Sequence, residues 1–167
     1  MDAAEIKERQ APLKERYRSD PTTAVVTLRA EGELDSASVA CSVATGKALV
    51  DAGLHPATGG DGTLACSGDM LLQALVACAG VTLRAVATAR GLDVTGTVRA
   101  EGDLDFRGTL GIDRDAPVGF RDIRLSFELQ SGASDEDLAA LIATTERYCV
   151  VLQTLRTQPS LVTSLAR

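Results

Sequence analysis

The stretch from Met70 to Ala89 constrains the fold of this chain more than any other segment. Almost every position in it is apolar, so the helix that its composition favours has no continuous polar face. A helix that is apolar all round must be buried all round. Ser67 is a suitable N-cap, Asp69 places a negative charge in the first turn, and Gly91 is a suitable C-terminal stop. The sequence therefore predicts a central helix over residues 69–90, about 33 Å long.

A chain of 167 residues has difficulty surrounding such a helix by itself. A second copy of the chain would supply the missing cover, so we expect an intimate homodimer with this helix at its centre. The stretch falls short of a membrane span, because Gln73, Gly80, Thr82 and Arg84 interrupt it. The N-terminus is charged and lacks the apolar segment of a secretory signal. We therefore expect a cytoplasmic protein without a membrane partner.

The remaining segments indicate an α+β fold with an antiparallel sheet. Residues 1–19 are polar and favour a helical arm with a break at Pro12, and residues 20–167 form a single domain. Strand and helix signals in that domain do not alternate, which argues against a doubly wound fold. The predicted strands are 23–31, 38–45, 92–104, 106–111, 120–130 and 160–165. The other predicted helices are one that starts at Ser134 and ends near Cys149, and a short one over 150–157.

Composition excludes several kinds of partner. Acidic residues outnumber basic ones by 23 to 17, and no basic run occurs, so no positive field attracts a nucleic acid. Aromatic residues are 3% of the chain, too few for a base-stacking surface. The chain has one histidine, and its cysteines form no CxxC pair, which excludes a zinc finger or ribbon. We therefore expect neither a nucleic-acid partner nor a bound metal ion.

Two further motifs have ordinary structural interpretations. The GGDG loop before the central helix matches neither a dinucleotide fingerprint nor a P-loop, and Asp61 would repel a phosphate. We interpret it as a turn. Two carboxylate pairs also lie in or beside predicted turns, where aspartate bonds to its own backbone. These turn-forming residues are Asp103 and Asp105, and Asp113 and Asp115.

The four cysteines, Cys41, Cys66, Cys78 and Cys149, are either inert buried thiols or reactive ones. Cys78 falls in the middle of the central helix, too far from its N-terminus for the helix dipole to lower the thiol pKa. A reactive thiolate there needs a cation from another element. Spacing alone marks neither Cys78 nor Cys149 as reactive. His55 lies in a His-Pro turn, and a loop histidine without chemistry is the simpler interpretation, although a catalytic Cys–His pair stays open.

Four stretches taken together carry a family resemblance. They are GGDGTLACSGDMLLQALVACAGVTL, the strand end GDLDFRG, the strand over 119–129, and TERYCVV with Gln153 and Thr154 behind it. They resemble the OsmC/Ohr family of osmotically inducible and organic hydroperoxide resistance proteins, over residue 21 to the C-terminus. The resemblance implies an antiparallel sheet wrapped on a long central helix, an intertwined homodimer, and no metal or organic cofactor.

The resemblance also implies an activity, the thiol-dependent reduction of organic hydroperoxides. By motif position, Cys78 would be oxidised to a sulfenic acid, and Cys149 would condense with it to a disulfide. A small dithiol or thiol would then reduce that disulfide by exchange. The expected partners are therefore a second copy of the chain, a hydroperoxide and a thiol reductant.

The sequence departs from the peroxidase branch of the family at the start of the central helix. That branch has a glutamate ten residues before the reactive cysteine, and this glutamate orients an activating arginine. Here Gly68 occupies the position, and its neighbour Asp69 lies about 180° around an ideal helix from Cys78. The carboxylate for the arginine would then have to come from Asp69, Glu146 or Glu31, from the same or the other subunit.

The activating arginine belongs to the N-terminal strand region in the family. Arg29 is the first candidate here, followed by Arg18 and Arg16. The proline that commonly precedes the helix is replaced by Cys66-Ser67, so Cys66 is an additional thiol near the helix start.

Two alternatives to the peroxidase stay open. The first is an OsmC-like stress protein that is not an enzyme, or that binds an apolar ligand in a pocket at the dimer interface. The second is an unrelated thiol enzyme that pairs Cys78 or Cys149 with His55.

Overall fold

The computed structural model describes residues 3–34, 41–43 and 52–165, with side chains for 8–26 and 52–165. The elements before the central helix are α1 (Ala3–Ser19), η1 (Pro21–Ala24), β1 (Val25–Leu34), β2 (Cys41–Val43), β3 (Ala52–Gly53), η2 (Pro56–Thr58) and β4 (Ala65–Cys66). The central helix and the elements after it are α2 (Ser67–Ala89), β5 (Val94–Asp105), α3 (Phe106–Thr109), β6 (Phe120–Ser131), α4 (Asp135–Tyr148) and α5 (Val150–Arg156).

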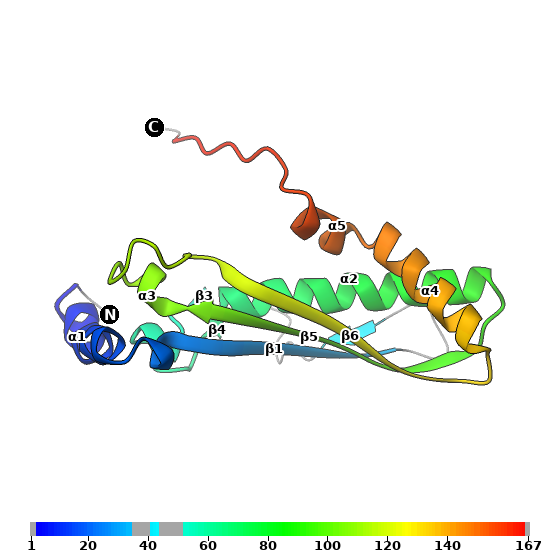
Figure 1. Ribbon diagram of the computed structural model, residues 1–167, viewed down its shortest axis with the longest axis horizontal. Helices are drawn as coiled ribbons and strands as arrows, with labels where there is room; N and C mark the ends of the chain where they lie inside the picture. Colours follow the sequence, from blue (N-terminus) through cyan, green and yellow to red (C-terminus); the bar gives the residue numbers. More distant parts are fainter. Residues whose placement is uncertain (1–2, 35–40, 44–51, 166–167) are drawn as a thin grey trace.

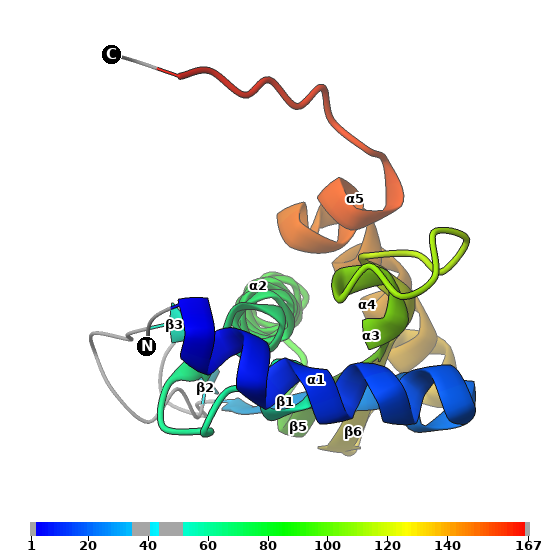
Figure 2. The ribbon, with the colours of Figure 1, turned by 90° about the vertical axis from the view of Figure 1, so that its left-hand side faces the viewer.

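A long helix lies on one face of an antiparallel sheet (Figures 1 and 2). The strand order is β2-β1-β5-β6, and every neighbouring pair is antiparallel. Alternate residues of β5 are buried, including Val98, Ala100 and Leu104, and form one core with α2. Gly102 shares this face, and a Cβ there would lie 2.5 Å from Phe120 and 3.4 Å from Leu72. The predicted α+β class with a long central helix is therefore confirmed.

Within the single chain the sheet covers only part of α2. The buried face includes Leu72, Leu75, Val76, Ala79, Leu83 and Ala87. A second face of α2 carries four exposed side chains, which we call the open stripe: Met70, Ala74, Val81 and Ala85. At 100° per residue, they lie within about 60° of one another around the helix axis. By length and composition alone, the helix could span a membrane. However, 44% of its most apolar part is buried inside the domain, as in the core helix of a globular protein.

The N-terminal helix α1 packs across one end of the domain (Figure 2). It runs through Pro12, so the predicted break is wrong. Pro12 is exposed, and water can therefore bond to the carbonyl that loses its helical donor. Near the end of α1, Tyr17 is fully buried, and its hydroxyl donates to the Ala57 carbonyl at 2.8 Å. This contact fixes the end of the arm to the domain.

Two predicted strands are wrong. Residues 106–109 form the short helix α3, because the buried Asp105 carboxylate caps it and accepts from the Arg107 backbone N–H at 3.1 Å. The arginine side chain bonds to the same carboxylate, which holds the helical turn in place. The segment 160–165 is exposed and pairs with no strand among the described residues; it leads away from the body in Figure 1.

Three smaller predictions are also decided. The N-cap of α2 is Cys66 rather than Ser67, with no side-chain hydrogen bond. Asp103 is a strand residue that pairs with Arg124 at 2.7 Å, so its predicted turn role is wrong. Asp113 does form a turn, since its carboxylate accepts from the backbone N–H of residue 115 at 3.0 Å.

Candidate functional site

The thiols of Cys78 and Cys149 are neighbours, close enough for Cys78 to shift the pKa of Cys149. Cys78 is half-buried in the middle of α2. Cys149 is fully buried at the junction of α4 and α5, where it ends one helix and begins the next. Its backbone N–H bonds to the Thr145 carbonyl at 2.9 Å, which completes the last turn of α4. The fold thus joins two cysteines that are distant in the chain.

Burial raises the pKa of the Cys149 thiol to about 11. Hydrogen bonding from the Leu152 backbone N–H works against this effect, and the neighbouring Cys78 sulfur adds to it. Cys149 is therefore a neutral thiol at pH 7. A neutral thiol is a weak nucleophile, so its reactions need either base or a change in its surroundings.

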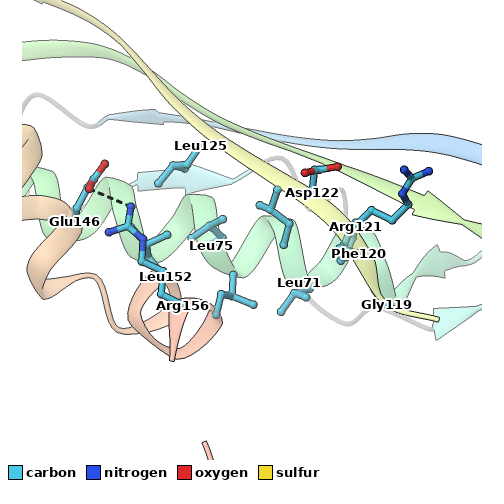
Figure 3. Close-up of a pocket in the computed structure, with 12 residues that line it drawn as sticks. Leu71, Leu75, Gly119, Phe120, Arg121, Asp122, Leu125, Glu146, Leu152 and Arg156 are labelled. Carbon is cyan, nitrogen blue, oxygen red and sulfur yellow. Dashed lines mark hydrogen bonds and ion pairs between the residues drawn. The ribbon is translucent and has the colours of Figure 1, made fainter. Parts of the chain in front are cut away.

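A cavity of about 580 Å³ opens between α2, β6 and α5 (Figure 3). Its size falls within the range that holds a small organic molecule. Leu75, one turn before Cys78, lies in its wall, as do Leu152 and Leu155 of α5. The wall is polar and apolar in about equal parts, so the cavity can hold the hydrocarbon part of a ligand beside a polar group.

An ion pair forms the polar part of the cavity wall beside α5. Arg156 pairs with the Glu146 carboxylate at 3.1 Å, as the dashed line in Figure 3 shows. The amide of Gln153 donates to the Glu146 carbonyl at 2.7 Å. The sequence pointed to Glu146 as a possible carboxylate for an arginine, but not to Arg156. The two residues are ten positions apart, across a break between two helices, and no helical pattern indicates such a pair.

Asp69 lies beside His55 at the start of α2. Burial raises the pKa of the Asp69 carboxyl, and the nearby histidine opposes this shift. Burial also lowers the pKa of His55, with the carboxylate opposing. Asp69 precedes Cys78 by nine residues, about 13 Å along the helix axis. The structure therefore brings Asp69 to the histidine and separates it from the Cys78 of its own chain.

His55 has a structural role in its loop. Its Nδ1 accepts from the Ala57 backbone N–H at 3.0 Å, and its ring stacks on Phe106 with 5.0 Å between centroids. The GGDG segment beside it forms turns, as predicted: Gly59 has a φ of +94° and caps η2. Asp61 accepts from the Thr63 backbone N–H at 3.0 Å.

The predicted arginines lie on two elements. Arg29 is in β1, paired in register with Glu101 of β5, and its side chain lies outside the described residues. Arg16 contacts the Tyr17 ring at 5.1 Å, and Arg18 forms an exposed pair with Glu15 at 3.5 Å. Both belong to α1, at the end of the domain that carries the N-terminus of α2.

The two other cysteines belong to other elements of the fold. Cys66 is half-buried at the N-cap of α2, and Cys41 is in β2 opposite Leu34, with its side chain outside the described residues. Among residues 8–26 and 52–165, no three His, Cys, Asp or Glu side chains gather closely enough to hold a metal ion.

The comparisons with known proteins decide the family. The family model described as OsmC-like protein matches residues 60–164, well over half of the chain. The chain belongs to the OsmC-like family. The solved structure of an OsmC-like hydroperoxide resistance protein from Jannaschia sp. CCS1 superposes with a TM-score of 0.56. That likeness covers 86% of this chain and 95% of the other at 19% identity, so it supports the fold. No curated protein matches the chain.

Proposed function

We propose that this OsmC-like protein is a thiol-dependent reductase of organic hydroperoxides, with Cys78 as the peroxidatic and Cys149 as the resolving residue. The proximity of their thiols carries the proposal. The fold brings the two side chains into one neighbourhood, as a disulfide between them requires. The half-buried Cys78 is the more accessible of the two and lies one turn after Leu75, which lines the cavity.

The proposed cycle has three steps. The Cys78 thiolate attacks the distal peroxide oxygen, the O–O bond breaks, and the alkoxide leaves as an alcohol after it takes a proton. The Cys149 thiol then attacks the sulfur of the resulting sulfenic acid, which forms the disulfide and releases water. A dithiol reduces the disulfide by two exchange steps and becomes oxidised itself.

A guanidinium beside Cys78 would complete this mechanism. Cys78 lies in an apolar helix, and a cation must stabilise its thiolate at neutral pH. Arginine suits this role because it stays charged when buried and presents several donors. Arg29 is our first candidate, with Asp69 or Glu146 of the same or a second subunit as its carboxylate.

We further propose that the protein works in the cytoplasm as an intertwined homodimer. The open stripe, Met70, Ala74, Val81 and Ala85, places exposed apolar side chains along the length of α2. Cys78 lies on the helix surface between this stripe and the cavity wall. A second copy packed on the stripe would therefore lie beside the thiol and leave its cavity side open to a peroxide.

A second candidate function is the binding of an apolar ligand without catalysis. The open cavity of about 580 Å³ favours it, because its wall of polar and apolar groups can hold a small organic ligand whether or not the thiols react. Gly68, at the position of the family's glutamate, also favours it, because a glycine supplies no carboxylate to orient an arginine.

Consumption of an organic hydroperoxide separates the two functions. Purified protein would receive cumene hydroperoxide and a dithiol, with Cys78→Ser, Cys149→Ser and Cys66→Ser as parallel variants. We expect turnover in the wild type and in Cys66→Ser, and its loss in the other two. Wild-type protein that binds the aromatic alcohol but consumes no hydroperoxide would support the binding function instead.

A further inference from the structure

The helix α5 covers Cys149 but is weakly attached. It contains no fully buried residue and is held to the core by the half-buried Val151 and Leu152. Every described residue after Gln153 is exposed. A short segment with few buried contacts opens at a low free-energy cost compared with the unfolding of the whole domain. α5 is therefore the element above the thiols that moves most easily.

Among the described residues, two side-chain hydrogen bonds fasten α5 to α4, and both end on Glu146. The Gln153 amide binds its carbonyl at 2.7 Å, and Arg156 binds its carboxylate at 3.1 Å. About half of the Arg156 side chain and 39% of the Glu146 side chain are exposed. Ion pairs with this exposure are weak and are screened by salt. This pair is therefore suited to repeated opening.

The hinge of the movement is Cys149 itself. Its φ of −70° and ψ of 105° are extended and interrupt the helix between α4 and α5. Rotation at this residue would lift α5 and expose the Cys149 sulfur. Cys78 lies on α2, is already half-buried, and needs no such movement to become accessible.

We propose that α5 is a flap that controls the access of thiols to Cys149, with the Glu146–Arg156 ion pair as its latch. This inference rests on the proposed function, because it assigns the flap to the reductive half of the cycle. When the flap is open, a thiolate of the dithiol bonds to the Cys149 sulfur, the disulfide breaks, and its electron pair leaves on Cys78. The second thiolate of the dithiol then attacks the mixed disulfide and releases Cys149, which takes up a proton.

The chemistry of the leaving group favours attack at Cys149. In thiol–disulfide exchange the sulfur with the lower thiol pKa leaves faster. Burial raises the pKa of Cys149, so Cys149 is a poor leaving group while it is covered. Attack at Cys149 makes Cys78 the first leaving group instead, but it requires the flap to open.

Alkylation of Cys149 tests the flap without any peroxide chemistry. Reduced Cys78→Ser protein would react with a bulky maleimide, and mass mapping would follow Cys149 and Cys66 separately. Glu146→Gln and Arg156→Gln would each break the latch, whereas Arg147→Gln removes an exposed neighbouring charge that stacks on Tyr148. We expect each latch variant to speed Cys149 alkylation about two- to fivefold, the range for an exposed ion pair.

Two further observations sharpen this test. Glu146→Gln combined with Arg156→Gln should react no faster than either alone, because both remove one interaction. Molar salt should speed the reaction of the parent protein but not of Glu146→Gln. Equal rates of Cys149 alkylation in all variants, or an equal rise of that rate in Arg147→Gln, would overturn the latch proposal. A parallel rise at Cys66 would indicate general loosening and would also overturn it.

A second measurement links the flap to the cycle. Oxidised protein with Cys78 intact would be mixed with a dithiol, and the opening of the disulfide would be timed. We expect the latch variants to open it faster than Arg147→Gln does. If peroxide forms no disulfide, the proposed function fails while the alkylation result still stands. If the disulfide forms but is reduced at the same rate in the latch variants and in Arg147→Gln, only the flap proposal is wrong.

Discussion

At the scale of single residues, the two thiols differ in their surroundings although they are neighbours. Cys149 is fully buried and neutral, while Cys78 is half-buried and lies one turn after a residue that lines the cavity. This difference suits a division of labour in which the accessible sulfur meets the peroxide and the covered one resolves the product. Neither role follows from spacing, because Cys78 lies far from the dipole at the helix start.

The pKa of Cys149 leads to a test with base. Below its pKa of about 11, the thiolate fraction rises tenfold for each pH unit. Alkylation of Cys149 in the reduced protein should therefore keep accelerating with pH up to about 11. A cysteine peptide as control should level off near its ordinary pKa of about 8.5. Mass mapping at each pH measures both; a plateau at Cys149 below pH 9 would contradict the burial effect.

Arg29 is the second test at this scale. If its guanidinium stabilises the Cys78 thiolate, Arg29→Ala should lower the thiolate absorbance near 240 nm at neutral pH and slow peroxide reduction about a hundredfold. Arg18→Ala is the matched control, since that side chain is exposed and pairs with Glu15. Equal absorbance and reactivity in wild type and Arg29→Ala would leave Arg29 as a strand residue.

At the scale of elements, the loop before α2 depends on close packing at Gly60. A Cβ at that position would lie 1.7 Å from the Leu54 carbonyl oxygen. Either the backbone at Gly60 or the backbone at Leu54 would have to move to make room for the Cβ. The loop sets the start of α2, and this explains a glycine there without any phosphate ligand.

Substitution at Gly60 tests this account. Gly60→Ala should destabilise the domain by about 2 kcal/mol or more, the scale of overpacking against backbone. Gly119→Ala is the control, because a Cβ there would meet nothing within 4 Å and the backbone at that position has no positive φ. Urea unfolding measures both variants. An unchanged midpoint for Gly60→Ala would show that the loop relaxes at no cost.

The elements also show what could be predicted from the sequence. The central helix and the strands 120–130 and 92–104 have long, regular apolar patterns, and the structure confirms them within a few residues. The composition of residues 106–111 is compatible with a strand. The carboxylate of Asp105 instead caps residues 106–109 as a short helix. The Glu146–Arg156 pair forms across a break between helices, where no repeat in the sequence indicates a contact.

At the scale of the whole molecule, the open stripe on α2 is an exposed apolar surface, and our homodimer proposal places a second copy there. Leu75 is fully buried within its own subunit, so a charge at that position would damage the fold and test nothing about assembly. Val81 is 41% exposed and lies on the stripe, so it reports on the interface alone.

Val81→Asp should therefore dissociate the dimer while the subunit stays folded, because an unpaired charge in an apolar interface is costly. Light scattering after size separation should give about 35 kDa for the wild type, twice 17.4 kDa, and about half of that for the variant. Val118→Asp is the control, with an exposed valine outside the helix. A wild-type monomer, or a dimer that survives Val81→Asp, would place the interface elsewhere.

The contact between two cysteines about 70 residues apart also has a consequence for the reduction potential. A bond between them would close a long loop and stabilise the native state by about 4 kcal/mol in the chain-entropy description. Thermodynamic reciprocity requires the native state to stabilise the bond by the same amount, which corresponds to a potential about 90 mV lower than in the unfolded chain. The folded protein thus holds its oxidised form tightly. A dithiol that gains its own ring closure is better suited to release it than a monothiol such as glutathione.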